Sequence, residues 1–178
     1  MLQINSLTTD QSLKIHSQEL WKMSIDGGEP IAVEGISKVD NYAWIDDNHI
    51  AVTEVGDHSV LKFVNFLLRE SKTIASNVGR SLHAWGGFLF FVEKDPGGAW
   101  WIKRYDPITG NVNNVLPAIK NREDFFVTAS DMILMADGQT IFYERNGKWR
   151  KLVQVESPDF YRIVVSADER KLVITTKN

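Results

Sequence analysis

Four short stretches of similar character recur along this chain at intervals of about 40 residues. Each is a run of apolar and basic residues that ends in Asp or Asn: LWKMSID at Asp26, VLKFVN at Asn65, WIKRYD at Asp106 and FYERN at Asn146. The steps between these turn residues are 39, 41 and 40 positions. The dipeptide Ala-Trp keeps the same interval, at 43–44 and 84–85. A period of this length indicates a chain built from copies of one supersecondary unit.

Each unit contains short strands rather than helices. No stretch keeps apolar residues at helical spacing over three turns. In residues 60–72 the apolar pattern fits a strand as well as a helix, so the secondary structure of that segment stays ambiguous. Short runs rich in β-branched and aromatic residues, separated by turn residues, fall at Ala43–Ile45, Ile50–Val55, Phe88–Val92, Trp100–Tyr105, Phe125–Thr128, Ile141–Glu144, Ile163–Val165 and Leu172–Thr175.

A unit of this length with four short strands, labelled a to d from the inside outwards, is one blade of a β-propeller. We therefore expect an all-β propeller of about four to five four-stranded blades. As one partial propeller domain over 1–178, its repeats are expected near 1–38, 39–78, 79–117, 118–158 and 159–178.

The stretch ELWKMSIDGGEPI, residues 19–31, is interpreted as the outer hairpin of the first blade. Asp26 and the two glycines after it supply the turn, because these residue types tolerate a positive φ or bond their own backbone. Pro30 is acceptable in an outer strand, whose open edge does not require every amide to donate. We expect Trp21 and Trp101 to fill the wedge between neighbouring blades.

The same stretch, with AWIDDNHIAV at 43–52 and IVVSADERKLVI at 163–174, resembles the repeats of TolB-type, WD40-like β-propellers. Those repeats read roughly as a strand ending in Ala-Trp-Ser-Pro-Asp-Gly, an apolar strand, and then Leu-Trp-x-Met-x-x-Asp-Gly-Gly-x-Pro. The Ser-Pro-Asp-Gly turn is altered in every repeat of this chain. The resemblance implies protein partners and a periplasmic or otherwise extracytoplasmic setting, with the cytoplasm as the alternative.

The final repeat contains only two expected strands, 160–166 and 170–176, whereas the first begins with its own pair at 4–8 and 12–17. We therefore expect the propeller to be incomplete or open, with an unpaired edge at Lys171–Thr175. Free strand edges template pairing with another chain. Two explanations stay open: the chain is a fragment of a larger propeller, or two copies pair along this edge as a homodimer.

Composition narrows the classes of partner. The formal charge of −3 gives no general attraction to phosphate backbones, so we expect no nucleic acid partner. No apolar run is long enough for a membrane span, and the first ten residues lack the basic and apolar regions of a signal peptide. Cysteine is absent, which excludes disulfides, thiolate metal sites and cysteine nucleophiles within this chain.

Candidate catalytic groups are few. Ser81 and His83 in VGRSLHA share one face of a strand, but no G-x-S-x-G is present and no orienting acid is assigned. Glu54, Glu93 and Glu144 each end an apolar run, and we expect solvated strand ends rather than paired catalytic carboxylates. We predict no catalytic residues.

Metal binding is not expected either. The four histidines lack metal-ligand spacing. The stretch IDDNH at 45–49 could offer oxygen ligands to Ca²⁺, but it lacks the Gly and the distal Glu of an EF-hand loop and stands where the repeat requires a hairpin. We expect turn chemistry there, and no metal or cofactor.

One connection, LPAIKNREDFF at 116–126, is longer than the period requires, and insertions in propellers lie on a rim. By blade topology the d–a and b–c loops share one rim, which gathers Asp57, His58, Arg80, Lys94, Asp95, Arg122 and Asp124. We expect a non-catalytic module that binds a protein or a small ligand through this rim. The alternatives are the propeller of a prolyl-oligopeptidase-like serine peptidase, or the extracytoplasmic sensor domain of a membrane-anchored transcription regulator.

Overall fold

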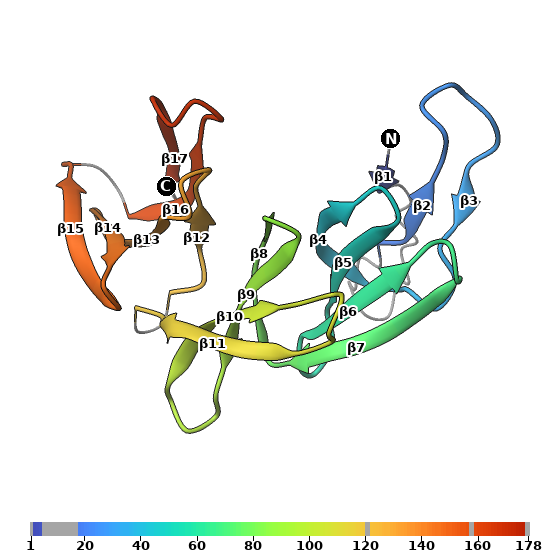
Figure 1. Cartoon of the computed structure of the whole chain (residues 1–178), viewed down its shortest axis with the longest axis horizontal. Coiled ribbons are helices and arrows are strands. Elements are labelled where there is room, and N and C mark those ends of the chain that lie inside the picture. The colour runs from blue at the N-terminus through green and yellow to red at the C-terminus, as the bar shows by residue number, and fades with distance from the viewer. Residues whose placement is uncertain (1, 5–17, 120–121, 157–158, 177–178) are drawn as a thin grey trace, which may run out of the picture. The chain divides into compact units, whose positions relative to one another are not determined.

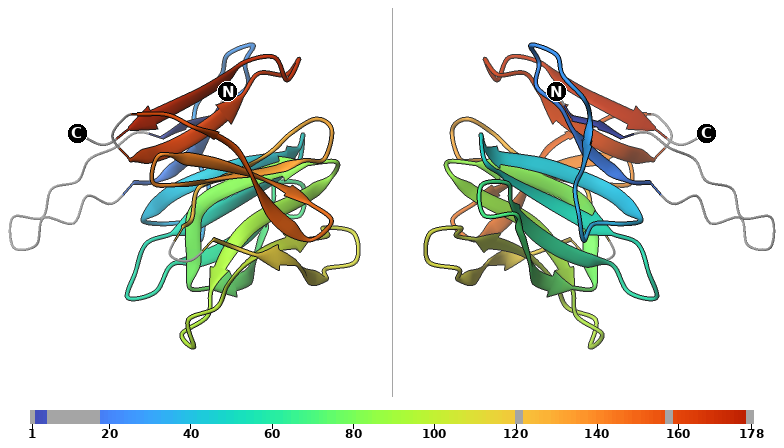
Figure 2. Two further views of the ribbon diagram at one scale, coloured as in Figure 1. Left: turned by 90° about the vertical axis from the view of Figure 1, so that its left-hand side faces the viewer. Right: turned by 90° about the vertical axis from the view of Figure 1, so that its right-hand side faces the viewer.

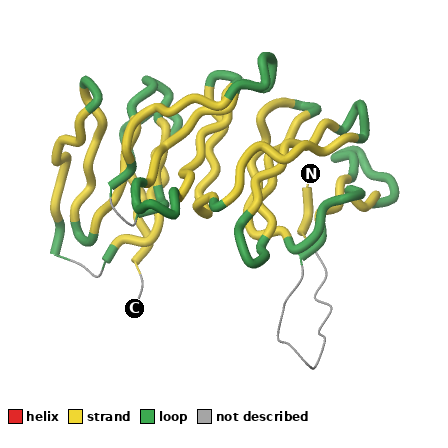
Figure 3. The backbone as a smooth tube through the Cα atoms, turned by 90° about the horizontal axis from the view of Figure 1, so that it is seen from below, coloured by secondary structure: helices red, strands yellow, loops and turns green. Residues whose placement is uncertain are grey.

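The chain consists of strands and turns. The computed structural model describes residues 2–4, 18–119, 122–156 and 159–176, and none of these residues is helical (Figure 3). No helix in this part of the chain has the length and apolar character needed to cross a membrane. Two compact units make up the structure, Met1–Val78 and Gly79–Asn178. The expectation of an all-β chain is confirmed.

The first unit contains a three-stranded and a four-stranded sheet (Figure 1). The smaller sheet pairs β1 (Leu2–Ile4), β2 (Leu20–Lys22) and β3 (Ile31–Ala32) in this order. The larger sheet is an antiparallel meander of β4 (Val39–Asp46), β5 (His49–Glu54), β6 (Val60–Asn65) and β7 (Glu70–Ser76). Residues 60–72, ambiguous in sequence, are thus two strands joined by a hairpin.

The second unit contains two further four-stranded meanders and a final hairpin. The first meander is β8 (Val78–Trp85), β9 (Phe88–Lys94), β10 (Trp100–Tyr105) and β11 (Val112–Pro117). The second is β12 (Phe125–Val127), β13 (Ile133–Asp137), β14 (Thr140–Arg145) and β15 (Lys148–Gln154). β16 (Phe160–Val165) and β17 (Leu172–Thr176) form a two-stranded sheet (Figure 2).

The middle strands of each meander are its most buried parts. Ala51 and Val52 of β5, and Phe91 and Val92 of β9, are all 0% exposed. Successive residues of a strand point to opposite faces. Burial of consecutive residues therefore means that both faces of the sheet are covered, as stacked blades require.

Apolar clusters join neighbouring sheets within each unit. In the second unit, Val92 and Ile102 of one meander pack with Phe125 and Met135 of the next. Ile141 in turn packs with side chains of the final hairpin. In the first unit, residues of the β1–β3 sheet and its flanks pack with the β4–β7 meander in a cluster of Leu20, Val33, Ile36, Val39, Ile50, Val52 and Val64.

The recurring Asp and Asn residues close the outer hairpins, as their spacing predicts. The Asn65 side-chain oxygen accepts hydrogen bonds from the backbone amides of Leu67 and Leu68 at 2.9 and 3.1 Å. Asp106 accepts from the Ile108 amide at 2.9 Å in the corresponding turn. Asn146 adopts a φ of 55°, which asparagine tolerates better than most residues.

Two expectations need correction or fall outside the described residues. The expected inner strand at 12–17 lies outside them, as does most of that at 4–8, and Leu2–Ile4 pairs directly with β2. On β10, Trp100, which was not predicted, packs against the apolar cluster that joins the two meanders, and the expected wedge residue Trp101 is half-buried on the opposite face. The physical reason is register, because Trp100 shares a face with the fully buried Ile102. Trp21, the other expected wedge residue, is half-buried on β2.

We predict that Ile102→Ala lowers the free energy of unfolding by about 2–5 kcal/mol, because it empties part of the cluster between two sheets. Ile108, which is 96% exposed in a neighbouring turn, is the matched control. Ile108→Ala is expected to stay within about 0.5 kcal/mol of the wild type. Chemical denaturation followed by tryptophan fluorescence measures both values, and equal losses in the two variants would contradict this packing.

Candidate functional site

The most concentrated set of polar contacts in the second unit lies where the long connection enters β12. Arg80 and Ser81 of β8 both bind Asp124, which directly precedes β12. The Ser81 hydroxyl donates to the Asp124 carboxylate at 3.0 Å, and the Arg80 guanidinium forms an ion pair with it. The Asp124 side chain is 12% exposed. A side chain with this little access to solvent takes its hydrogen-bond donors from the protein.

Glu123 adds a second link between the same elements. Its carboxylate accepts the backbone amide of Arg80 at 3.0 Å and pairs with Lys94 of β9 at 3.0 Å. The Lys94 ammonium also lies 5.6 Å from the centre of the Trp100 ring. Two neighbouring acids of the connection therefore fasten it to the first two strands of the preceding meander.

Gly79 lets the connection come this close. A Cβ atom at Gly79 would lie 3.2 Å from the Cβ atoms of both Glu123 and Val92. That separation is tighter than about nine in ten real Cβ contacts, so a side chain at Gly79 would require Glu123 and Val92 to shift by a few tenths of an ångström. Gly79 and the two acids, Glu123 and Asp124, together allow the connection to pack closely on the preceding meander.

The rim predicted from sequence is only partly one cluster. Arg80, Lys94 and Asp124 meet through the contacts described above. Arg122 pairs instead with Asp137 of β13 at 2.7 Å. Asp95 caps its own turn by accepting the Gly97 amide at 2.8 Å.

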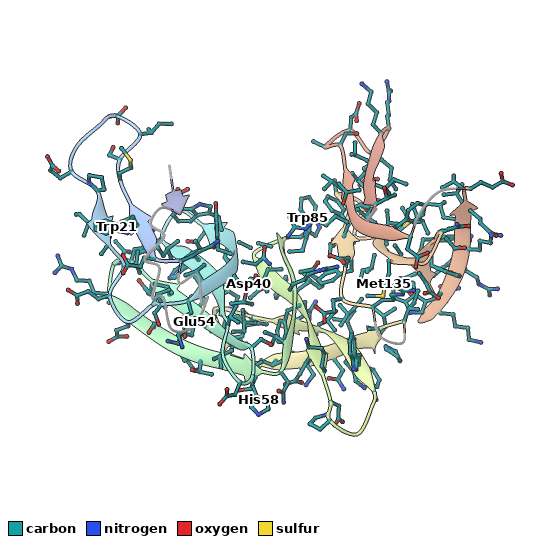
Figure 4. The ribbon with its side chains drawn as sticks, turned by 180° about the vertical axis from the view of Figure 1, so that it is seen from behind. Trp21, Asp40, Glu54, His58, Trp85 and Met135 are labelled. Carbon is teal, nitrogen blue, oxygen red and sulfur yellow. The ribbon has the colours of Figure 1, made fainter. Side chains whose placement is uncertain are left out.

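The remaining two predicted rim residues belong to the first unit. Asp57 and His58 are exposed on the loop between β5 and β6, and Figure 4 labels His58 there. Both residues belong to Met1–Val78, whereas the cluster around Asp124 belongs to Gly79–Asn178.

The arrangement of Ser81 and His83 differs from that of a nucleophile and its base. Ser81 donates to a carboxylate, whereas a serine nucleophile needs its proton within reach of an imidazole. His83 packs edge-on against Phe126, with ring centres 4.4 Å apart, and its buried Nδ1 has no hydrogen-bond partner among the described residues. Burial lowers the pKa of His83 below its ordinary value because the charged form would lose hydration.

The three strand-end glutamates each contact a different partner. Glu54 pairs with Lys62 at 2.8 Å, Glu93 pairs with Lys103, and Glu144 accepts the Gly147 amide at 2.6 Å. Each contact lies within the sheet that carries the glutamate. The three do not form the paired carboxylates of a glycosidase-type site.

The IDDNH hairpin behaves as a turn. Asp46 accepts the Asn48 amide and contacts His49 Nδ1, both at 2.8 Å. Among the described residues, no group of three or more metal-ligating acids and histidines is positioned to hold an ion. His16 lies outside this part of the chain.

Several partners were not predicted from the sequence. Glu123 and Asp137 complete the pairs of Lys94 and Arg122, and Trp85, at the end of β8 (Figure 4), donates to Asp131 at 2.6 Å. Glu169 of the final hairpin accepts both the amide and the hydroxyl of Ser130, at 2.6 and 2.8 Å. The charged triplet Arg-Glu-Asp before β12 was the available signal for Glu123.

Known structures share this arrangement of sheets. TolB from Acinetobacter baumannii superposes with a TM-score of 0.64 at 18% identity, over 90% of this chain and 43% of that one. The β-propeller domain of the Trilobed protease from Pyrococcus furiosus, described as having an open velcro topology, gives 0.59 at 15% identity, over 82% and 55%. The chain has a TolB-like, WD40-like β-propeller fold. The expected fold class is confirmed.

A further structural match is an extracellular domain. The extracellular domain of a protein described as a hybrid two-component system from B. thetaiotaomicron gives a TM-score of 0.65 at 11% identity, over 90% of this chain and 25% of that one. The chain thus spans roughly half or less of each of these three structures. No protein-family model matches it, and no curated protein matches it in sequence.

The buried imidazole generates a pH prediction. The pKa of His83 is lowered in the folded state from the ordinary histidine value of 6.5. As the pH falls through 6.5, the imidazole is therefore protonated in the unfolded chain before it is protonated in the folded one. The stability that neutral His83 contributes is therefore complete above that pH and declines below it. We expect His83→Gln to flatten the fall in unfolding free energy between about pH 7.5 and about pH 5.5.

Urea denaturation across that range measures the effect. His58→Gln, which changes an exposed histidine of the first unit, is the control and is expected to keep the wild-type slope. Identical slopes for the wild type and His83→Gln would show that burial of this imidazole is not linked to folding.

Proposed function

We propose that this chain is a non-catalytic β-propeller module that binds a protein or a small ligand through the loops at one rim. The observation that carries the proposal is that the charged side chains around Asp124 already bind one another. Arg80, Lys94, Glu123 and Asp124 are engaged with one another, and Ser81 with Asp124, so these groups hold sheets together. Of the predicted rim residues, Asp57 and His58 are exposed on one loop of the first unit and remain for recognition.

The comparisons support a module of this kind within larger proteins. TolB, a protease propeller and an extracellular domain of a two-component system all match this fold, and this chain covers only part of each of them. An extracytoplasmic location is proposed on the same ground, because one of the three is described as an extracellular domain.

Two alternatives keep the same module and change its setting. The protease propeller favours a role beside a peptidase domain, and the sensor favours a role in signal reception. A downstream G-x-S-x-G in the parent reading frame would identify the first. An upstream basic DNA-binding segment with one apolar span of about 20 residues would identify the second.

Rim recognition is tested by panning a random-peptide phage library, and screening a metabolite panel by thermal shift, against the folded chain. Ligands selected from either source are expected to lose about tenfold or more in affinity in a variant carrying Asp57→Ala and His58→Ala. Lys148→Ala, at an exposed c–d hairpin, is the control and is expected to bind normally. Ligands that depend only on Lys148, or no ligand in either screen, would overturn the proposed rim.

We further propose a homodimer through the edge at Lys171–Thr175. Among the described strands, β17 pairs only with β16, so its other side presents open backbone donors and acceptors. Leu172 and Val173 on it are 37% and 62% exposed. The exposed apolar side chains of this edge favour strand addition from a second copy.

The dimer is tested by light scattering coupled to size-exclusion chromatography. We expect a mass about twice the 20.2 kDa of the chain, reduced to one copy by Val173→Lys, which places a charge on the edge. Val55→Lys, at a 53% exposed position in the first unit, is expected to leave the mass unchanged. A monomer at the highest attainable concentration would contradict the pairing.

A further inference from the structure

A small pocket in the first unit lies between the β2–β3 hairpin and the outer strands of the next meander. Its volume is about 170 Å³, below the roughly 300–1,000 Å³ typical of drug-sized ligand sites. Ile31, Val33, Val64 and Phe66 form its apolar lining. The pocket therefore suits a molecule of a few heavy atoms with an apolar part.

The apolar lining rests on the core of the unit. Val33 and Val64 belong to the buried cluster between the two sheets, and Phe66 packs against that cluster. Trp44 of β4 supports Phe66 from another side, with ring centres 5.5 Å apart. A lining fixed in this way keeps its shape without a ligand, which reduces the entropic cost of binding.

Four charged side chains stand around this lining: Lys22, Glu34, Arg69 and Glu70. None of the ion pairs found in the described part of the chain includes any of them. The Lys22 ammonium lies 4.9 Å from the centre of the Phe66 ring, at the edge of the apolar lining. These groups differ from the paired charges around Asp124, which satisfy one another.

Two cations and two carboxylates around one apolar lining match a ligand that carries both signs of charge. Glu34, Arg69 and Glu70 are exposed, so a ligand with one charge alone would engage one pair of side chains and leave the opposite pair to the solvent. Asn65, also in the lining, contributes little selection, because its side-chain oxygen already accepts the amides of the hairpin.

We propose that this pocket binds a free α-amino acid with an apolar side chain. The carboxylate is held by Lys22 and Arg69, the ammonium by Glu34 and Glu70, and the side chain lies on Val64 and Phe66. Charge-assisted hydrogen bonds fix the orientation, and the apolar lining selects the side chain. The site lies apart from the exposed rim loops, so it stands or falls independently of the rim proposal.

Isothermal titration calorimetry of the whole chain with L-leucine tests the site. We expect 4-methylpentanoate, which lacks the ammonium group, and 3-methylbutylamine, which lacks the carboxylate, each to bind about tenfold or more weakly than leucine. L-glutamate is expected to bind poorly, since its second carboxylate would meet the apolar lining. Binding of 4-methylpentanoate as tight as that of leucine would overturn the zwitterion assignment.

Matched variants locate the binding. Lys22→Met keeps most of the side-chain length and is expected to weaken leucine binding about tenfold. Lys72→Met, on β7 but outside the lining, is expected to have no effect. Circular dichroism and the unfolding midpoint confirm that both variants fold. Equal binding by the two variants, or no heat with leucine, valine, isoleucine, methionine or phenylalanine up to their solubility limits, would overturn the proposal.

Discussion

The structure depends on one constraint: β5, β9 and β13, in the middle of the three meanders, bury consecutive residues, so both faces of each strand must be kept from water. Ala51 and Val52 of β5, and Phe91 and Val92 of β9, are 0% exposed. A single four-stranded sheet would leave both faces in water, and burial of an apolar side chain is worth about 1.5–3 kcal/mol. Sheets of this kind are stable only when they stack, which is why the repeat and the fold go together.

Apolar stacking of the sheets does not by itself position the connections between them. In the second unit, polar contacts position the connection that enters β12. The connection that enters β12 is drawn against the preceding meander by Glu123 and Asp124, and Gly79 provides the space. Charges that are fully engaged with one another contribute structure rather than chemistry. The charged side chains around Phe66 in the first unit are outside the ion pairs found in the described part of the chain, so a ligand would find partners there rather than around Asp124.

The repeat, the strands and the turn residues were predictable because each is a local property. Asp106 and Asn146 close hairpins at the expected interval, since turn chemistry involves only a few neighbouring residues. Residues 60–72 could not be assigned from periodicity, because Asn65 breaks the run through a side-chain bond that apolar spacing does not report. The packing of Trp100 on the next meander was missed because it depends on the register of β10, and register is decided by pairing with β9.

The candidate sites were less predictable because they depend on contacts between sheets. The sequence placed Arg80, Lys94 and Asp124 at one rim, and they do meet, but their common partner Glu123 was missed. The pocket beside Phe66 left no sequence signal, since its residues come from two segments, 22–34 and 64–70, that are 30 positions apart and share no motif. Only the packing of one sheet on the next brings Lys22 to Phe66.

The most direct measurement of the central claim is native-state hydrogen exchange, read amide by amide by NMR. The account predicts the slowest exchange in the paired middle strands β5 and β6, β9 and β10, and β13 and β14, approaching the global unfolding free energy of each unit. The outer strands β7, β11 and β15, each paired on one side only, are predicted to exchange faster. Protection that is uniform across each meander, or greatest in its outer strands, would contradict the claim that two-sided burial of the middle strands holds the fold together.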